Sequence, residues 1–188
     1  MNKIIVLALL LTIGFTSCKN SKNEIDKLEI AKQYYKVLDN SDDSRIAVLL
    51  TDSLVTKESD YEQTFSLAEY IEWLKWDSVF DPTYETLQIE HENGVVKARV
   101  SKIDKRIFFL HEGPIVTNQT IRFDDDKIIS IETTDYVDFK DDVFVKNRSN
   151  LLSWIDEHHP ELKGFIHDQT KKGGLKYLKA IELYEKEN

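Results

Sequence analysis

Cysteine is nearly absent from this chain of 188 residues, which contains a single one, Cys18. A lone cysteine cannot form an internal disulfide or a cysteine-based zinc site, so a disulfide scaffold and a zinc finger are both excluded. Proline and glycine are also scarce, with three and six residues. Because no proline- or glycine-rich linker and no repeat divides the chain, the sequence favours one domain over two.

Positive charge is in short supply, because 25 lysines and arginines face 34 aspartates and glutamates, a formal net charge of −9. Binding to nucleic acid needs a basic surface for the phosphates, so this composition argues against a nucleic-acid partner. Aromatic residues, in contrast, are plentiful, with nine Phe, eight Tyr and three Trp. Their capacity to bury apolar surface excludes a chain that is disordered throughout.

The N-terminus has the three parts of an export signal. Lys3 precedes an apolar run over residues 4–13, and the small residues Thr16 and Ser17 lead to Cys18. A membrane-spanning helix needs about 20 apolar residues, so this run is too short to be retained as a span. The segment that ends at Cys18 resembles the lipobox of bacterial lipoproteins, in which the cysteine becomes the first residue and carries acyl chains.

We therefore expect residues 1–17 to be a lipoprotein signal peptide and residues 18–24 to be a polar tether. The resemblance implies acyl chains, palmitate among them, on Cys18, and a lipid-anchored protein of the bacterial cell envelope, outside the cytoplasm. Two such chains anchor a protein stably, because each buried methylene contributes about 0.8 kcal/mol. The choice between the periplasm and the cell exterior stays open.

Helices are expected before the sheet. Apolar residues recur at helical spacing over 25–39, and a short second helix over 45–50 precedes an irregular or extended stretch over 51–64. Ser66 and Glu69 have the spacing of a capping box, which predicts the start of another helix.

From Tyr84 onward, the apolar period changes from 3.6 to 2, which predicts two strands joined by a hairpin turn at Asn93-Gly94. Further strands are expected over 106–111, 115–123 and 127–136. Short connections require consecutive strands to be antiparallel. Helices return near Ser149 and near Gly174. The pattern predicts an α+β fold, with helices on a curved antiparallel sheet of four or five strands.

The segment 120–132 has a phenylalanine strand that ends in an acidic turn, followed by Lys-Ile and a strand that closes near Asp135. Together with the helices and the hairpin, it resembles the nuclear transport factor two-like (SnoaL-like, ketosteroid-isomerase-like) superfamily over about residues 25–138. The resemblance implies a cystatin-like cone around a pocket, formed by residues 25–140. The expected C-terminal helices add an extension over 141–188, packed on the same domain. Members include enzymes, ligand binders and dimeric scaffolds, so the fold does not decide the function.

Four side chains are candidates for acid–base chemistry. His91 and His111 share strand faces with apolar residues, and imidazoles in an apolar pocket could transfer protons. We favour the alternative that both are solvated at strand ends, beside turns. Glu132 and Asp135 lie where some enzymes of the superfamily place a catalytic carboxylate, but the acidic block 124–142 favours a solvated edge.

Aromatic residues are the candidates for ligand binding. Trp73 and Trp76 are three residues apart on the capped helix, where they form either a wall for a flat apolar ligand or part of the core. Tyr34, Tyr35 and Phe109 are further candidates, the two tyrosines as hydrogen-bond donors. The spacing of the C-terminal histidines does not suit ligation, so we expect no metal and no cofactor.

We expect a lipid-anchored domain that binds a small apolar or amphiphilic ligand, or a protein partner, without catalysis. One alternative is an isomerase-, dehydratase- or cyclase-like enzyme that uses the cone pocket. Another is a structural envelope protein that forms a homodimer through the open face of its sheet.

Replacement of the acylation site tests the anchor. We expect Cys18→Ala to leave an unprocessed or unanchored precursor, because the variant lacks the thiol group whose sulfur would carry the lipid. Membrane fractionation with mass spectrometry of the N-terminal peptide measures this. A variant that stays in the membrane in mature, acylated form would contradict the assignment.

Overall fold

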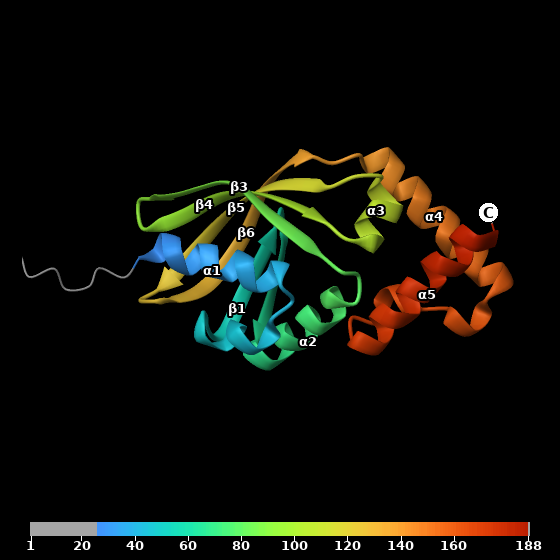
Figure 1. Ribbon diagram of the computed structural model, residues 1–188, viewed down its shortest axis with the longest axis horizontal. Helices are drawn as coiled ribbons and strands as arrows, with labels where there is room; N and C mark the ends of the chain where they lie inside the picture. The colour runs from blue at the N-terminus through green and yellow to red at the C-terminus, as the bar shows by residue number, and fades with distance from the viewer. Residues whose placement is uncertain (1–25, 188) are drawn as a thin grey trace, which may run out of the picture.

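A computed structural model describes residues 26–187 of the protein. The expected signal peptide at 1–17, the tether at 18–24 and its Cys18 lie outside the described residues. Among the helices of residues 26–187, none has the length and apolarity that a bilayer span requires. Helices pack against a curved sheet, as predicted, in an α+β fold (Figure 1).

Within the described residues, six strands form one sheet in the order β2-β1-β6-β5-β4-β3. Their bounds are β1 (Leu50–Glu58), β2 (Tyr61–Ser66), β3 (Thr83–Glu92), β4 (Val95–Ile103), β5 (Ile115–Asp124) and β6 (Lys127–Asp138). Neighbours pair antiparallel, except β1 and β6, which pair in parallel. The pairing of β5 with β6 shifts register at three points, and such bulges bend a strand. The sheet therefore curves and leaves a concave face.

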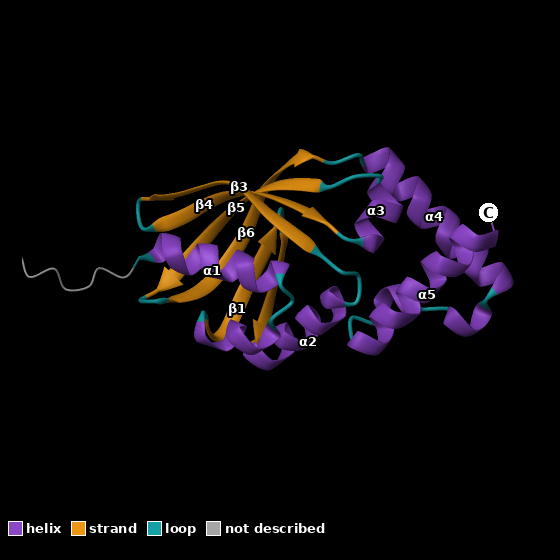
Figure 2. Cartoon of the chain, in the orientation of Figure 1, coloured by secondary structure: helices purple, strands orange, loops and turns teal. Residues whose placement is uncertain are grey.

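The helices cover the concave face and one end of the sheet (Figure 2). They are α1 (Lys27–Asp39), α2 (Leu67–Ser78), α3 (Lys105–His111), α4 (Asp141–His158) and α5 (Lys171–Glu187), with short 3₁₀ turns η1 (Asp43–Val48), η2 (Pro160–Leu162) and η3 (Phe165–His167). α1 packs across β3 and β4, whereas α4 packs on α3 and α5 packs on α2. The start of α1 and the C-terminal helices lie at opposite ends of the long axis (Figure 1).

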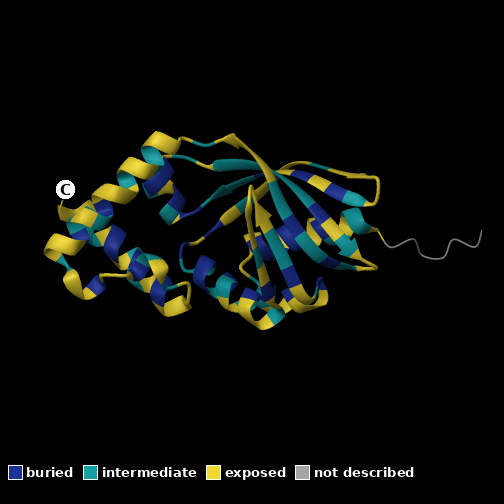
Figure 3. Cartoon of the chain, turned by 180° about the vertical axis from the view of Figure 1, so that it is seen from behind, coloured by how far each residue is buried: buried dark blue, intermediate teal, exposed yellow. Residues whose placement is uncertain are grey.

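Two apolar clusters form the core, and Figure 3 shows buried positions both along the sheet and among the C-terminal helices. The first cluster fills the space between α1, α2 and the sheet, with Ala31, Leu54 and Ile121 fully buried. The second joins the end of α2 to α3, α4 and α5 around Phe80. Trp73 packs against both clusters, so α2 is the element that connects them.

The local sequence signals for α2 and the β3–β4 hairpin are confirmed. The Ser66 hydroxyl accepts a hydrogen bond from the Glu69 backbone N–H at 3.3 Å, and the Glu69 carboxylate accepts one from the Ser66 N–H at 2.7 Å. This reciprocal pairing is the capping box that starts α2. At the hairpin, Asn93 and Gly94 have φ angles of 52° and 82°, as a turn with two left-handed residues requires.

The prediction of a strand over 106–111 is wrong, because these residues belong to the helix α3. The side chain of Asp104 caps this helix by accepting a hydrogen bond from the Ile107 N–H. Glu112 ends it in the left-handed conformation, with φ of 56°. An apolar run of four residues suits a strand or a helix, and here the cap at each end decides for the helix.

Three further expectations need correction. The expected count of four or five strands is too low, because the stretch 51–64 is extended, the second of its two expected alternatives, and lies in the hairpin of β1 and β2; the sheet has six strands. The sheet is also mixed, because β1 joins β6 in parallel. Finally, α4 begins at Asp141 rather than near Ser149, with Asp141 and Asp142 in the first turn, where negative charge is favourable.

His111 is fully buried in α3, so its expected solvated position at a strand end is also wrong. Its Nδ1 lies 3.0 Å from the Gly113 carbonyl oxygen, and its Nε2 accepts a hydrogen bond from the Lys140 backbone N–H at 2.7 Å. Its ring stacks on Phe139 at 5.4 Å. The imidazole therefore ties α3 to the segment that leads into α4.

Replacement of this imidazole tests its structural role. We expect His111→Leu to lower the free energy of unfolding by about 1–3 kcal/mol, because the part-buried Gly113 carbonyl and Lys140 N–H lose their partner. Urea denaturation measures this. His91→Leu is the matched control, since His91 is exposed, and equal stability of both variants would contradict the assignment.

Candidate functional site

A cavity of about 400 Å³ lies between α1, α2 and the concave face of the sheet. Seven aromatic residues contribute to its lining, and they are Tyr34, Tyr61, Phe65, Tyr70, Trp73, Tyr84 and Tyr136. Its aliphatic lining includes Leu38, Val100, Ile115 and Ile131. The volume falls in the range of about 300–1,000 Å³ that is usual for small-molecule sites.

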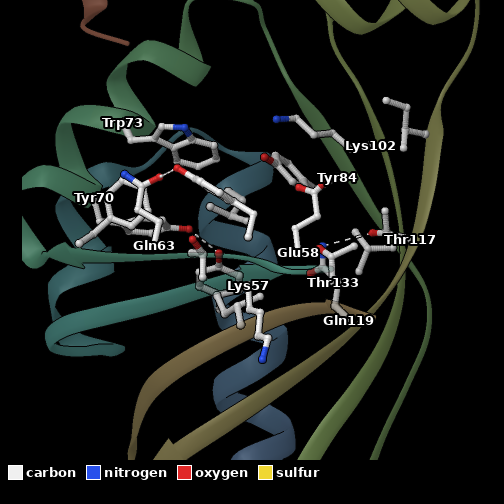
Figure 4. A pocket seen from close by; sticks show the side chains of 18 of the residues that line it. Lys57, Glu58, Gln63, Tyr70, Trp73, Tyr84, Lys102, Thr117, Gln119 and Thr133 are labelled. Carbon is white, nitrogen blue, oxygen red and sulfur yellow. Dashed lines mark hydrogen bonds between the residues drawn. The ribbon is translucent and has the colours of Figure 1, made fainter. Parts of the chain in front are cut away.

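The α2 side of the cavity is an aromatic wall (Figure 4). The rings of Tyr70 and Trp73 stack with centroids 5.5 Å apart and an interplanar angle of 16°. The hydroxyls of Tyr34 and Tyr70 lie 2.5 Å apart, so one donates to the other. Burial, above all, raises the pKa of both hydroxyls, which keeps them protonated at neutral pH.

A buried ion pair lies where α2 meets β3 and β4. Asp77 is 2% exposed, and its carboxylate accepts hydrogen bonds from the Lys102 ammonium at 2.5 Å and the Tyr84 hydroxyl at 2.9 Å. The Lys102 ammonium also lies 4.8 Å from the centroid of the Tyr84 ring. Burial, followed by the charge of Asp77, raises the pKa of Tyr84. Lys102 and Tyr84 line the cavity, and both already form hydrogen bonds to the buried Asp77 carboxylate.

The strand side of the cavity is polar, with Thr117, Gln119 and Thr133 opposite the aromatic wall (Figure 4). The exposed Lys57 and Glu58 of β1 add one charge of each sign to the lining. The Gln119 side-chain oxygen accepts a hydrogen bond from the Tyr35 hydroxyl at 2.8 Å, and its amide donates to Thr117 at 3.2 Å. The interior amide is therefore also paired within the protein.

At the rim, the Tyr136 hydroxyl donates to the exposed Glu58 carboxylate at 2.7 Å and joins β6 to β1. Burial and, next, this carboxylate raise the pKa of Tyr136. The hydroxyl therefore remains a donor to Glu58 at neutral pH.

The structure brings two of the five aromatic candidates to the cavity. Tyr34 and Trp73 line the cavity. Tyr35 does not, but its hydroxyl donates a hydrogen bond to Gln119, which does. Trp76 and Phe109 belong to the second apolar cluster, where they contact the rings of Phe80 and Tyr184.

None of the four acid–base candidates lines the cavity. His91 is exposed near the end of β3, and His111 is buried in α3. Successive residues of a strand point to opposite faces, and Ile131 and Thr133 line the cavity, so Glu132 points away from it. There Glu132 pairs with Arg122 at 2.7 Å. Asp135 is exposed, 3.5 Å from the Asn118 amide.

Sequence reasoning missed Tyr70, Asp77, Tyr84 and Lys102. Tyr70 had a signal, since it precedes Trp73 by three residues and so lies near the same helix face. Asp77 and Lys102 are 25 residues apart, and no local pattern joins them. Within residues 26–187, no group of three or more His, Cys, Asp or Glu residues is arranged to hold a metal ion.

No protein-family model matches the sequence, and no curated protein matches it. Solved structures do match. A protein of Kribbella flavida is similar with a TM-score of 0.51 and 9% identity, over 65% of this chain and 93% of its own. A nuclear transport factor two-like protein of unknown function from Cytophaga hutchinsonii has a TM-score of 0.49 and 10% identity, over 61% of this chain and 93% of its own. An epoxide hydrolase of M. tuberculosis has a TM-score of 0.49 and 14% identity, over 64% of this chain and 83% of its own.

The Kribbella flavida structure shares the fold of the described residues, helices on a curved sheet, in agreement with the α+β fold that the sequence predicted. At such low identity, the likeness establishes the fold alone.

Removal of one member of the buried ion pair tests its contribution. We expect Asp77→Asn to lower the free energy of unfolding by about 3 kcal/mol, because it leaves the Lys102 charge largely buried without its main partner. The double variant Asp77→Asn/Lys102→Met should recover part of this loss.

Denaturant unfolding of the variants measures both effects. Glu92→Gln, in the exposed Glu92–Lys97 pair, is the control and should change stability little. An Asp77→Asn protein as stable as this control would show that the buried pair contributes nothing.

Proposed function

We propose that the protein is a lipid-anchored, non-catalytic binder of a small amphiphilic ligand, which the cone cavity encloses. The observation that carries the proposal is a cavity of about 400 Å³ with accessible aromatic walls and polar groups that already pair with one another. An apolar ligand body gains about 25 cal/mol for each Å² of apolar surface that it buries there.

The pairing of the polar groups favours binding over catalysis. A general base must reach the proton it removes within about 2.6–3.2 Å. Asp77 is the buried carboxylate beside the cavity, and Lys102 and Tyr84 occupy its two oxygens. His91, His111, Glu132 and Asp135 lie elsewhere. The carboxylate on the lining itself, Glu58 at the rim, already accepts a hydrogen bond from Tyr136. A ligand in the cavity would therefore meet hydrogen-bonding groups that have partners within the protein.

The tyrosine pair supports a second candidate, an isomerase-, dehydratase- or cyclase-like enzyme. The short contact between the Tyr34 and Tyr70 hydroxyls places neutral donors at the cavity wall, where one could polarise a substrate carbonyl. This candidate needs Asp77 to exchange its partners for the substrate, whereas binding needs no such change.

The position of α1 bears on the proposed anchor. α1 begins at the end of the molecule that is far from α4 and α5 (Figure 1). An anchor on Cys18 would attach at this end, and the C-terminal helices would then lie on the side away from the membrane.

Filling the cavity tests the binding proposal. We expect the uncharged fluorescent probe 1-N-phenylnaphthylamine to bind the wild-type protein, and Thr133→Trp to weaken binding at least about tenfold, because the indole would occupy cavity volume. Fluorescence titration gives both affinities. The adjacent Thr134→Trp is the matched control, since Thr134 lies exposed, outside the residues that line the cavity.

Wild-type protein that fails to bind the probe would contradict the proposal. Equal affinity of the Thr133→Trp variant and the wild type would do so as well, because the probe would then occupy another surface.

A further inference from the structure

A second hollow, a shallow groove of about 280 Å³, lies along α2 beside the cavity. It is lined by Phe65, Ala68, Glu69, Glu72, Trp73 and Gln169. Three of these residues, Phe65, Trp73 and Gln169, also line the cone cavity. These three side chains therefore border both spaces, and a ligand longer than the cavity would pass them to reach the groove.

The chemistry of the groove suits a hydrocarbon chain. Phe65, Ala68 and Trp73 supply its apolar surface, and the carboxylates of Glu69 and Glu72 flank it. Hydrogen bonds from Ser66 lower the pKa of Glu69, and the Glu72 carboxylate pairs with the Lys75 ammonium at 2.7 Å. An anionic group in the groove would be repelled, whereas methylenes carry no charge.

The chemistry of the cavity suits the other end of such a molecule. Its strand side carries Thr117, Gln119 and Thr133, and the Lys102 ammonium lies on its lining. These groups donate hydrogen bonds to carboxylate or hydroxyl oxygens. The cavity thus offers hydrogen-bond donors for the polar end of an amphiphile, and the groove offers apolar surface for its hydrocarbon chain.

The C-terminal extension supplies one wall of the passage. Gln169 lies between η3 and α5, on a turn in which the Asp168 carboxylate accepts hydrogen bonds from the Thr170 N–H and hydroxyl at 3.1 and 2.6 Å. The Thr170 hydroxyl in turn accepts one from the Gly173 N–H at 3.2 Å. This turn holds Gln169, which lines both spaces together with Trp73.

We infer that the ligand is a single-chain amphiphile of the fatty-acid type, with its polar end in the cone and its hydrocarbon chain passing Trp73 and Gln169 into the groove. The inference rests on the proposed function, that the cone binds an amphiphile, and adds the shape of the ligand and a second subsite. A compact ligand would fill the cavity alone and leave the groove empty.

Chain length tests the inference. Isothermal titration calorimetry with octanoate, decanoate and dodecanoate should show affinity that rises up to about fourfold for each added methylene, the value for full burial. Ala68→Gln places a polar side chain in the groove, and we expect it to weaken dodecanoate about tenfold while octanoate binds as before. Ala47→Gln adds the same atoms at another exposed position, in η1 and outside both hollows, and should match the wild type.

The outcomes separate the inference from the proposal on which it rests. Equal affinities across the three chain lengths, or equal losses for octanoate and dodecanoate in Ala68→Gln, would overturn the groove subsite and leave the cone proposal standing. If neither the three carboxylates nor 1-N-phenylnaphthylamine bound the wild-type protein, both would fail.

Discussion

The buried Asp77 carboxylate is the point on which the geometry of the cone depends. It fixes the end of α2 to β3 through Tyr84 and to β4 through Lys102. Lys102 lies 3.7 Å from Asp104, which caps α3, and Asp104 lies 3.5 Å from Arg106. The Arg106 guanidinium rests over Trp76 in the second apolar cluster. Burying these charges costs desolvation energy, which each charge offsets with an opposite partner. The same network that closes the cone therefore positions the C-terminal helices.

This network also determines what the cavity offers a ligand. Because Asp77 and Lys102 neutralise each other, the polar end of the cavity carries hydrogen-bonding capacity with little net charge. The tyrosine hydroxyls are neutral donors, since burial raises their pKa values. Proton transfer would require one of these partners to leave, with the cost of an unpaired buried charge. Recognition requires no rearrangement, which is the physical reason to prefer a binder to an enzyme for this site.

The sequence was informative where structure depends on neighbours in the chain, as in the Ser66–Glu69 capping box and the Asn93-Gly94 hairpin. It misled at α3, where the apolar run alone suits either element and the Asp104 cap decides. Long-range pairings were out of reach: β1 joins β6 across more than 70 residues, and the His111 imidazole meets Lys140 after 29. The residues of the site also divide into those that a local pattern indicates and those that only long-range pairing brings together. Tyr34 and Trp73 followed from aromatic residues on amphipathic helices, whereas the Asp77–Lys102 pair exists only once β4 lies against α2.

The two neighbouring tryptophans show why helical spacing alone could not define the wall. Three residues turn a helix by about 300°, so Trp73 and Trp76 project in directions about 60° apart. Because α2 lies between two apolar clusters, that rotation separates a residue that lines the cavity from one that packs against Phe80. Trp73 touches both clusters and Gln169 comes from the extension, so ligand contacts with this pair depend on how α5 packs on α2. A ligand that touches both residues binds the packed arrangement preferentially and stabilises it by linkage. Binding of such a ligand would thus couple the C-terminal extension energetically to the cavity.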